Sequence, residues 1–479
     1  MLDKRNFYIN GQWCSPEKIN DFDVVDPSTE NVIGVVSLGD IADTNSAVRA
    51  AKDAFEDWSI SPKQQRVDLI KKILEIYQER TEDIAKAISL EMGAPIDMAK
   101  TQQVGSGEWN IKGMLHALMN FEFDQPLGKH APEDRIFYEP MGVCGLITPW
   151  NWPMNQMTLK VMPALAAGCT MVLKPSEIAP LSGMILAEIM HDAGTPAGVF
   201  NLVNGDGAGV GTQLSTHSDI DMISFTGSTR AGAEISKNSA STYKRVHLEL
   251  GGKGANIIFS DADEKAVKRG VLHCFNNSGQ SCNAPTRMLV QREIYENSIV
   301  TAAKIANSYA VGPASESGRH AGPVVSQIQF EKIQSCIKQG LDEGARLVAG
   351  GLGLPEGVNR GYFIKPTVFC DVSNEMSIAQ EEIFGPVLSI LPFDNEEEAI
   401  RIANDIPYGL TNYVQSGDEE KRKRVARRLR SGMVEINGKP RSIGSPFGGV
   451  KASGNGREGG VWGLEEYLEV KAVSGWSDS

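Results

Sequence analysis

The sequence predicts an α/β fold whose core is a parallel β-sheet, and two observations lead to this prediction. From Gly142 onward, short apolar runs alternate with helix-length amphipathic segments, as in successive β-α-β units. The first five of these runs each end in polar or glycine-rich residues, at the positions where an open α/β sheet binds its ligands. A chain of 479 residues also exceeds what one hydrophobic core usually holds, so two or three domains are expected.

The first 120 residues or so are expected to be mainly helical and to cover the sheet. Apolar residues recur there at helical spacing in segments 43–58, 62–80 and 83–92. Five strands are expected next, joined by stretches with mostly helical patterns; they span residues 143–148, 170–173, 199–203, 222–225 and 246–250. Near the end of the chain, residues 467–473 alternate as a further strand.

Composition and charge exclude several classes of protein. With 41% hydrophobic and 22% charged residues, the chain is an ordinary globular one, and its net charge of −13 argues against a nucleic-acid partner. The cationic run 421–430 is expected on a solvated helix face. The N-terminus carries no export signal, and the most apolar segment, 161–173, is too short to span a bilayer. A cytoplasmic protein without a membrane partner is expected.

The cysteines and histidines indicate neither a disulfide framework nor a metal site. Seven cysteines, an odd number, are scattered without a Cys-x-x-Cys pair, and seven histidines occur without a His-Glu-x-x-His motif. No Gly-x-Ser-x-Gly elbow is present, and no motif links a histidine to Cys282, so hydrolases of the serine or cofactor-free cysteine type are unsupported. Chemistry is therefore expected from side chains and an organic cofactor.

Two residues have the chemistry needed to form and then hydrolyse a thioester. Glu249 lies in a strand-like run that breaks at Gly251, and Cys282 follows 33 positions later in a polar loop that begins with Gly279. A thiolate can attack a carbonyl carbon, and a carboxylate can activate water. Taken singly, a cysteine is more often a small buried hydrophobic residue, so the surrounding sequence has to decide.

The strand ends also offer candidate binding groups for a cofactor. Residues 227–232 open a helix, where free backbone N–H groups favour a phosphate, although the spacing matches neither a P-loop nor the usual dinucleotide motif. Lys174 and Glu177 follow a buried strand and can both hydrogen-bond a ribose diol. A surface ion pair at a turn is the alternative for these two residues.

Together, segments spread over essentially the whole chain resemble the signature segments of the aldehyde dehydrogenase superfamily. They occur in the family order and comprise residues 149–153, 225–228, 248–253, 279–282, 381–387 and 446–449. The resemblance implies oxidation of an aldehyde to a carboxylic acid with a nicotinamide cofactor. It also implies a Rossmann-like cofactor domain, a second α/β domain and a small β oligomerisation arm.

The resemblance assigns roles to the reacting residues. Cys282 is the expected nucleophile, Glu249 the general base and Asn151 the oxyanion donor. The thiolate adds to the aldehyde to give a thiohemiacetal, hydride passes to the nicotinamide, and water activated by Glu249 hydrolyses the thioester. Lys160 and Glu458 match positions that relay protons in some members of the family, and a structural ion pair is the alternative for them.

Positions for the cofactor and the substrate follow in the same way. The expected cofactor contacts are Trp150, Lys174, Ser176, Glu177, Gly207, Thr226, Gly227, Ser228, Glu382 and Phe384. Glu177 should repel a 2′-phosphate, so NAD is expected over NADP, although Ser176 could donate to such a phosphate. The expected substrate pocket contains Trp152, Asn155, Gln156, Leu159, Ser281, Asn283, Arg441, Ile443 and Phe447. Arg441, where the family often has an aromatic residue nearby, either binds a substrate carboxylate or faces solvent, which leaves apolar, aromatic and carboxylated aldehydes open.

The same resemblance divides the chain. Residues 1–121 and 141–252 are expected to bind the dinucleotide, 253–446 to form the catalytic domain, and 122–140 with 447–479 to form the bridging arm. The strand at 467–473 could add to a neighbouring subunit's sheet, which implies a homodimer or homotetramer. Two alternatives remain. One is a coenzyme-A-acylating semialdehyde dehydrogenase, a type that commonly lacks a carboxylate at the position of Glu249. The other is a catalytically silent family member used for binding or structure.

Overall fold

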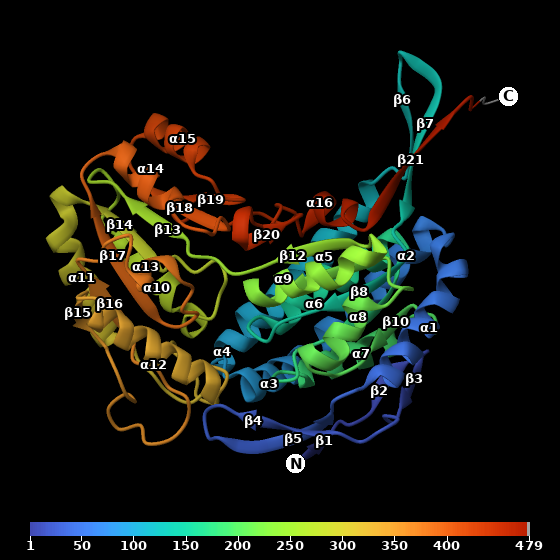
Figure 1. The fold of residues 1–479 in the computed structure, drawn as a ribbon, viewed down its shortest axis with the longest axis horizontal. Coiled ribbons are helices and arrows are strands. Elements are labelled where there is room, and N and C mark those ends of the chain that lie inside the picture. Colours follow the sequence, from blue (N-terminus) through green and yellow to red (C-terminus); the bar gives the residue numbers. More distant parts are fainter. Residues whose placement is uncertain (477–479) are drawn as a thin grey trace.

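The computed structural model describes residues 1–476 and shows two α/β lobes, with a narrow β-arm projecting from one of them (Figure 1). An eight-stranded sheet forms the core of the larger lobe. Its strands lie in the order β20 (Gly454–Asn455), β12 (Arg245–Glu249), β11 (Met222–Thr226), β8 (Val143–Ile147), β9 (Thr170–Lys174), β10 (Phe200–Leu202), β2 (Phe7–Ile9) and β3 (Gln12–Cys14). The five strands predicted between residues 143 and 250 are thereby confirmed.

The central five strands of this sheet are parallel and doubly wound. β8 lies in the middle, β9 and β10 follow on one side, and β11 and β12 follow on the other. After β10 the chain crosses back over β8 and continues with β11 and β12. The order in which strands are added to the sheet therefore reverses between β8 and β11. Such a switch point leaves a crevice outside the carboxyl ends of the two strands, which is where ligands bind in this type of sheet.

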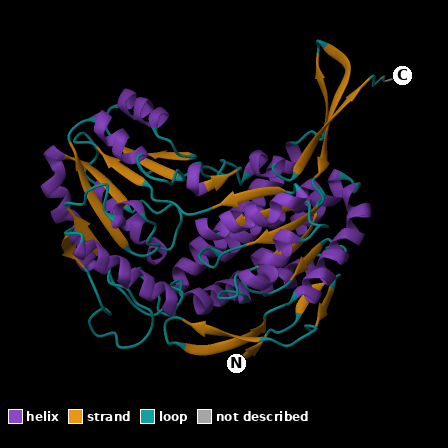
Figure 2. Cartoon of the chain, in the orientation of Figure 1, coloured by secondary structure: helices purple, strands orange, loops and turns teal. Residues whose placement is uncertain are grey.

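Helices cover both faces of the large sheet (Figure 2). Side chains alternate along β8, so Val143 and Ile147 join a core with α1 on one face, while Cys144 and Leu146 join a core with α6 on the other. The helices of this lobe are α1 (Ile41–Ser59), α2 (Lys63–Glu79), α3 (Thr81–Met92), α4 (Ile96–Met98), α5 (Val104–Asn120), α6 (Pro153–Ala167), α7 (Leu181–Asp192), α8 (Thr212–Thr216), α9 (Thr229–Ser239) and α16 (Gly460–Glu465). The helices predicted at 43–58, 62–80 and 83–92 correspond to the first three.

The N-terminal segment also contains strands that the sequence pattern did not reveal. β1 (Leu2–Asp3), β5 (Asn31–Ser37) and β4 (Asp21–Asp26) form a separate three-stranded sheet, and β2 and β3 extend the large one. In β5 the buried residues are consecutive rather than alternating, so the period-two signal of a strand is missing.

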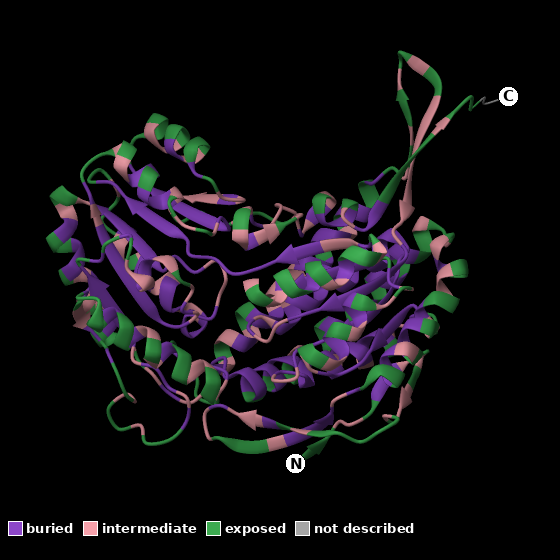
Figure 3. Ribbon diagram, in the orientation of Figure 1, coloured by how far each residue is buried: buried purple, intermediate pink, exposed green. Residues whose placement is uncertain are grey.

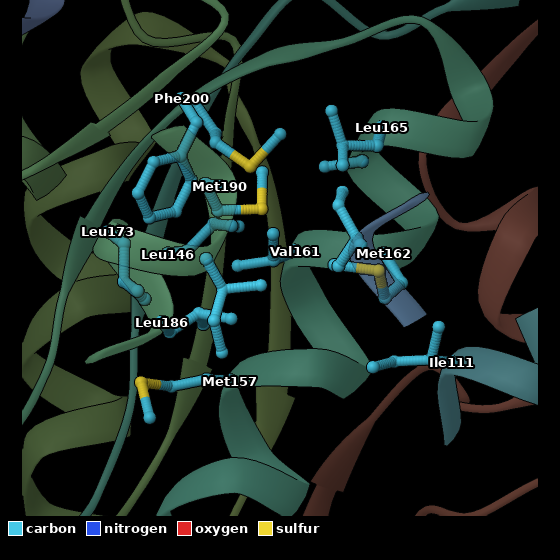
Figure 4. Packing of buried hydrophobic residues seen from close by; sticks show 14 of the residues in the cluster. Ile111, Leu146, Met157, Val161, Met162, Leu165, Leu173, Leu186, Met190 and Phe200 are labelled. Carbon is cyan, nitrogen blue, oxygen red and sulfur yellow. The ribbon is translucent and has the colours of Figure 1, made fainter. Parts of the chain in front are cut away.

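Helix α6 is buried on all sides and forms the centre of the larger lobe. Figure 4 shows Val161, Met162 and Leu165 of this helix among Leu146 of β8 and Phe200 of β10. The C-terminal half of α6, from Val161 on, is apolar on every side, and such a segment belongs in a core. The apolar segment 161–173 is thus the end of α6 followed by β9, and no helix within residues 1–476 is long and apolar enough to cross a membrane.

The second lobe is built on a seven-stranded sheet. Its order is β15 (Arg346–Ala349), β16 (Thr367–Cys370), β17 (Val387–Phe393), β14 (Arg287–Gln291), β13 (Ala255–Ile258), β18 (Thr411–Gln415) and β19 (Met433–Ile436), with β15 antiparallel to its neighbour. Its helices are α10 (Ala266–Phe275), α11 (Tyr295–Ser308), α12 (Gln327–Asp342), α13 (Ser377–Gln380), α14 (Glu396–Asn404) and α15 (Glu419–Arg428). The cationic run is α15, capped by Asp418 and ion-paired to α14 through Arg424 and Glu396, as expected of a solvated helix.

The arm is a three-stranded antiparallel sheet that is mostly exposed, in contrast to the buried strands of the two lobes (Figure 3). It consists of β6 (Asp124–Gly128), β7 (Ala131–Pro140) and β21 (Leu468–Ser474), in the order β21-β7-β6. The strand predicted at 467–473 is therefore confirmed. Residues 477–479, which the sequence assigned to the same bridging segment, lie outside the described part of the chain.

Candidate active site

A pocket lies where the switch point of the large sheet meets loops of the second lobe. It contains the predicted residues Asn151 and Cys282 together with most of the predicted cofactor contacts. The residues that line it are Pro149, Trp150, Asn151, Gln156, Thr226, Gly227, Ser228, Leu250, Gly251, Cys282, Gln329, Lys332, Glu382 and Phe384. The fold thus brings together segments that lie more than two hundred residues apart in the sequence.

Cys282 is presented by a tight loop that follows α10. The turn before it places Asn277, Ser278 and Gly279 in the left-handed region, with φ of 52°, 55° and 73°. A Cβ at Gly279 would overlap the backbone of Gly385, so the loop can come this close only with glycine there. Cys282 is partly exposed, and its thiol faces the pocket.

Buried amide groups hold this loop against the residues that follow β8. The Asn151 side chain donates to the carbonyl of Gln280 (3.0 Å), and Asn277 Nδ2 donates to the carbonyl of Asn151 (2.9 Å). Gln103 Nε2 donates to the same Asn151 carbonyl (3.1 Å) and to Asn277 Oδ1 (3.3 Å). These bonds fix the distance between the Cys282 loop and the Asn151 segment from both sides.

The glycine pair after β12 allows two further close approaches. A Cβ at Gly252 would overlap the carbonyl oxygen of Cys282, and one at Gly251 would overlap the carboxylate of Glu382. Glu382 Oε1 accepts a hydrogen bond from the backbone N–H of Gly252 (2.9 Å). The two glycines therefore let the nucleophile loop and the Glu382 carboxylate lie directly against the end of the sheet.

The electrostatic surroundings keep the Cys282 thiol protonated. Burial raises the pKa of this thiol strongly, and the nearby carboxylates of Glu382, Glu249 and Glu458 raise it further. Arg441 acts in the opposite direction with a smaller effect. A group that brings positive charge into the pocket would therefore favour the thiolate.

Glu249 ends β12 but does not line the pocket that contains Cys282. Its side chain is buried, and within residues 1–476 neither carboxylate oxygen has a hydrogen-bond partner. Burial raises the pKa of this carboxyl well above its ordinary value, Glu458 adds to the effect, and Lys160 and Arg457 oppose it. A carboxyl of this kind suits a general base that must work near neutral pH.

Lys160 and Glu458 form a buried ion pair behind Glu249. Lys160 Nζ lies 2.7 Å from Glu458 Oε1 and also donates to the hydroxyl of Ser224 (3.1 Å). Both side chains are almost completely excluded from solvent. The two predicted residues are therefore in contact, and removing either would leave an unpaired buried charge.

Six predicted cofactor residues line the pocket: Trp150, Thr226, Gly227, Ser228, Glu382 and Phe384. Ser228 caps the N-terminus of α9, and the rings of Trp150 and Phe384 meet edge to face with centroids 5.4 Å apart. Phe384 has a φ of 62°, and Gln329 of α12 donates to its carbonyl (2.8 Å). These contacts fix Phe384 at the pocket, which the start of α9 also lines.

The other predicted cofactor residues lie outside this pocket, at the ends of neighbouring strands. Lys174 is buried, and its ammonium donates to the carbonyls of Gly205 (2.7 Å) and Pro175 (2.8 Å) and lies 3.4 Å from Glu177. It is thus not a surface pair, and its protons already have partners in the protein. Ser176 Oγ accepts from the next turn, and Gly207 begins an exposed π-helical turn after β10.

The predicted substrate residues lie on α6 and just before it, beside Cys282 in its loop, and in the C-terminal loop. Trp152 Nε1 donates to the Ser281 hydroxyl (2.8 Å), and the carbonyl of Asn283 accepts from Tyr413 (2.6 Å). Asn155 accepts from Asn110, Leu159 is buried, and Gln156 reaches the pocket. Ile443 is 53% exposed and lies beside Gly113 of α5, at the outer edge of this region.

Arg441 is neither fully solvated nor firmly paired. Its guanidinium lies 4.6 Å from the centre of the Phe447 ring, and its Nε is 3.8 Å from a carboxylate oxygen of Glu435. Burial lowers the pKa of Arg441, while Glu435 raises it. The positive charge near the substrate side is thus partly balanced by a carboxylate of the same lobe.

Several residues of the site could not be found from the sequence. Gln103, Gln329 and Lys332 reach the Cys282 loop or the pocket from helical segments without a motif. His247 lies two residues before Glu249, on the same face of β12, and directly precedes the signature segment 248–253 without belonging to it. Only a motif or a regular spacing in the sequence could have pointed to Gln103, Gln329 and Lys332, and none is present around them.

Comparison with known proteins gives consistent results over the full length of the chain. The sequence model of the Aldehyde dehydrogenase family matches residues 13–473. The chain is 51% identical to a 3-succinoylsemialdehyde-pyridine dehydrogenase from a Pseudomonas species, with 100% of both chains covered. A crystal structure of an aldehyde dehydrogenase from Bartonella henselae superimposes with a TM-score of 0.98 at 59% identity, covering 99% of this chain and 100% of that one. Aldehyde dehydrogenase C of Pseudomonas syringae, crystallised as a mutant with NAD+ and octanal, gives a TM-score of 0.97 at 47% identity, covering 99% and 97%.

Proposed function

The chain belongs to the aldehyde dehydrogenase family, and we propose that it oxidises an aldehyde to the carboxylic acid with Cys282 as nucleophile and Glu249 as general base. It is an NAD-dependent enzyme of this family. The observation that carries the residue roles is the joint placement of Cys282, Asn151 and Glu382 in one pocket at the switch point of the sheet. The pocket thus combines a nucleophile (Cys282), a hydrogen-bond donor for the oxyanion (Asn151) and a carboxylate that can contact the cofactor (Glu382).

The residues of the pocket fit a nicotinamide dinucleotide. The start of α9 offers free N–H groups for a diphosphate at Ser228, and Glu382 can accept from a ribose hydroxyl. Glu177, beyond the next strand, can accept from the second ribose and should disfavour a 2′-phosphate. NAD, when bound, supplies the hydride acceptor and a positively charged ring. The Cys282 thiol, whose pKa is raised in part by Glu382, loses its proton more readily beside such a charge.

Cys282 and Asn151 perform the first half of the reaction. The Cys282 thiolate adds to the aldehyde carbon and gives a thiohemiacetal oxyanion. Asn151 Nδ2 uses one N–H for the Gln280 carbonyl and retains a second for the oxyanion, which the backbone N–H of Cys282 can also reach. Loss of hydride from the same carbon leaves an acyl thioester on Cys282.

Glu249 performs the second half. It removes a proton from water, the hydroxide attacks the thioester carbonyl, and the acid leaves while Cys282 is released as a thiolate. The raised pKa of Glu249 makes it a stronger base than an ordinary carboxylate. Glu249 does not line the Cys282 pocket, although its charge raises the pKa of the Cys282 thiol, so we propose that its side chain turns toward the thioester for this step.

Product analysis separates this proposal from the coenzyme-A-acylating alternative. With aldehyde, NAD and coenzyme A together, free acid is expected in an amount equal to the NADH formed, and Cys282→Ala is expected to form no NADH. Acyl-coenzyme A formed in preference to acid would overturn the hydrolytic assignment. NADH formation by Cys282→Ala at the wild-type rate would rule out the nucleophile and favour a different site.

For the substrate, we propose a neutral aldehyde with an apolar or aromatic body. Trp152, Leu159 and Phe447 supply apolar surface, and the charge of Arg441 is engaged by Phe447 and Glu435. The named ligand octanal and the pyridine semialdehyde of the two relatives agree with this choice. In a panel of aldehydes, kcat/KM is expected to be higher for octanal and aromatic aldehydes than for carboxylated ones. A preference for carboxylated aldehydes that is lost in the variant Arg441→Gln would overturn the proposal of a neutral substrate.

The quaternary structure and the domain roles are proposals too. We propose that β21 and β6, the edge strands of the arm, pair with a second copy of the chain to give a homodimer or homotetramer in the cytoplasm. Residues 1–121 and 141–252 would hold the cofactor, and 253–446 would carry the thiol. Light scattering should give at least twice the mass of one chain, and a monomer mass of 51.9 kDa would contradict the assembly.

A further inference from the structure

His247 and Glu249 form a buried pair that the mechanism above does not use. They are two residues apart on β12 and therefore point to the same face of the sheet. His247 Nε2 lies 3.7 Å from Glu249 Oε1, about 1 Å longer than a hydrogen bond. Both side chains are almost completely excluded from solvent, at 1% and 2% exposed.

None of the four polar atoms of this pair has another partner. Within residues 1–476, both ring nitrogens of His247 and both carboxylate oxygens of Glu249 are buried without a hydrogen bond. Such groups are costly to leave unpaired, so two of them facing each other across a short gap are best satisfied by each other or through one water. The pair is therefore a site where a proton can be shared.

The backbone around the pair is shaped to hold both side chains. A Cβ at Gly448 would come within 2.6 Å of Glu249 Oε1, and one at Gly456 would come within 2.7 Å of the His247 ring. Both glycines have positive φ, 153° and 77°, so a larger residue would be disfavoured there on two grounds. The two side chains therefore lie against glycine backbone, and Glu249 is not among the residues that line the Cys282 pocket.

The charges around the pair favour the neutral form of each member. His247 faces Lys160 of α6 and Arg457 of the loop after β20, which together with burial lower its pKa well below the ordinary value. Glu249 faces Glu458 and Glu466, which together with burial raise its pKa, while Lys160 and Arg457 oppose that shift. Between a neutral imidazole and a carboxylic acid, the stronger hydrogen bond is the one that the acid O–H donates to the ring nitrogen.

We propose that His247 is a positioning residue for Glu249: its Nε2 accepts a hydrogen bond from the protonated carboxyl group and holds that side chain away from Cys282 in the free enzyme. The inference rests on the proposed role of Glu249 as general base. Loss of the carboxyl proton breaks this bond and releases the carboxylate to turn toward the thioester. The imidazole thus sets the pH at which the base becomes available.

The test is a titration of the Glu249 carboxyl in the free protein by infrared spectroscopy. The carbonyl band of the protonated acid is assigned by its absence in Glu249→Gln. His247→Val removes the acceptor and leaves room for water, so the midpoint is expected to fall by about 0.5–1 pH unit. His247→Gln keeps an acceptor in place of Nε2 and is expected to retain the wild-type midpoint. His217→Gln, in the loop before β11, serves as the control for replacing a histidine.

Each outcome decides the proposal. A midpoint in His247→Val that equals or exceeds the wild-type value would overturn it, as would equal shifts in the Val and Gln variants. Absence of the Glu249 band at neutral pH in the wild type would overturn the proposal, and if His247→Val does not fold, His247→Leu, which also lacks an acceptor, is titrated in its place with the same expected fall. The titration contains no aldehyde or NAD, so its result stands apart from that of the product analysis. In the enzyme, the acid limb of the thioester hydrolysis rate should move with the same midpoint.

Discussion

The loop that carries Cys282 and the strand end that carries Glu249 differ in how their polar side-chain atoms are paired. Around Cys282, the amides of Asn151, Asn277 and Gln103 are linked by hydrogen bonds of 2.9–3.3 Å. Around Glu249, the carboxylate and the imidazole of His247 have no partners among the described residues. The Cys282 loop is thus tied to the Asn151 segment by hydrogen bonds, and we call it the fixed side. No hydrogen bond fixes the Glu249 carboxylate, and we call this part the mobile side.

This difference matches the tasks that we assign to the two sides. A nucleophile and its oxyanion donors work best when they are fixed before the substrate arrives. A general base that acts only on the second intermediate has to be absent from the pocket at first, because hydride leaves from the same carbon. If the Glu249 carboxylate is to move, it cannot have firm hydrogen bonds in its resting position, which leaves it buried and unpaired.

Replacing the general base Glu249 on the mobile side should reduce the rate of turnover by a large factor. Glu249→Gln is expected to slow steady-state turnover by roughly 10²–10⁴-fold, since water is no longer activated. The first turnover should still yield about one NADH per active site, because formation of the thioester does not need Glu249. Stopped-flow absorbance of NADH measures both phases. Loss of the first turnover together with the steady state would contradict this division of labour.

Removing the Gln103 amide on the fixed side should reduce catalysis by a smaller factor. Gln103→Ala leaves the Asn151 carbonyl and Asn277 with fewer partners, and kcat/KM is expected to fall roughly 10–100-fold as the two segments lose their spacing. In contrast to Glu249→Gln, the rate of the first turnover should fall. The neighbouring Gln102→Ala, which removes an exposed bond to Asn276, is the matched control and should stay near wild type. Equal effects of the two variants would argue against a specific role for Gln103.

The charge on the fixed side can be tested without substrate. Glu382 contributes to the raised pKa of the Cys282 thiol, so Glu382→Gln should lower that pKa and increase the thiolate fraction at a given pH. Alkylation of Cys282 by iodoacetamide at about pH 7.5 is expected to be roughly two- to fivefold faster in the variant. Peptide mass spectrometry measures the rate at this cysteine. Slower alkylation in Glu382→Gln would contradict the sign of the effect.

The smallest expected effect is on stability, and it concerns the mobile side. The pKa of Glu249 is raised in the folded protein, so between an unfolded value of about 4.3 and the folded value the folded state binds more protons. Stability therefore falls as the pH rises through this window, and Glu249→Gln avoids that loss. The variant is expected to melt roughly 2–4 °C higher than wild type at pH 7, with the difference vanishing near pH 4. A lower melting temperature at pH 7 would mean that the ionised carboxylate is stabilising.

The sequence was informative where local pattern and function coincide. Apolar runs predicted the five central strands, and the residues after them predicted the edge at which Asn151 and Ser228 meet, whereas the place of Cys282 followed from the family resemblance. The N-terminal strands were missed because β5 buries consecutive residues. Gln103 was missed because it reaches the site through tertiary packing, which one sequence does not encode as a spacing. His247 lies two residues before Glu249 on a predicted strand, so its face could be predicted, but its unpaired ring nitrogens could not. Whether Glu249 lies beside Cys282 or apart from it depends on a side-chain rotamer, which no pattern reports.

The central claim is that an acyl group passes through Cys282 and is released by Glu249. Mass spectrometry of Glu249→Gln, mixed with NAD and octanal and quenched in acid, tests it most directly. We expect the peptide that contains Cys282 to gain the mass of the octanoyl group, with no gain in Cys282→Ala and only a transient one in wild type. An unmodified Cys282 peptide in Glu249→Gln, in a sample that has formed NADH, would contradict the account.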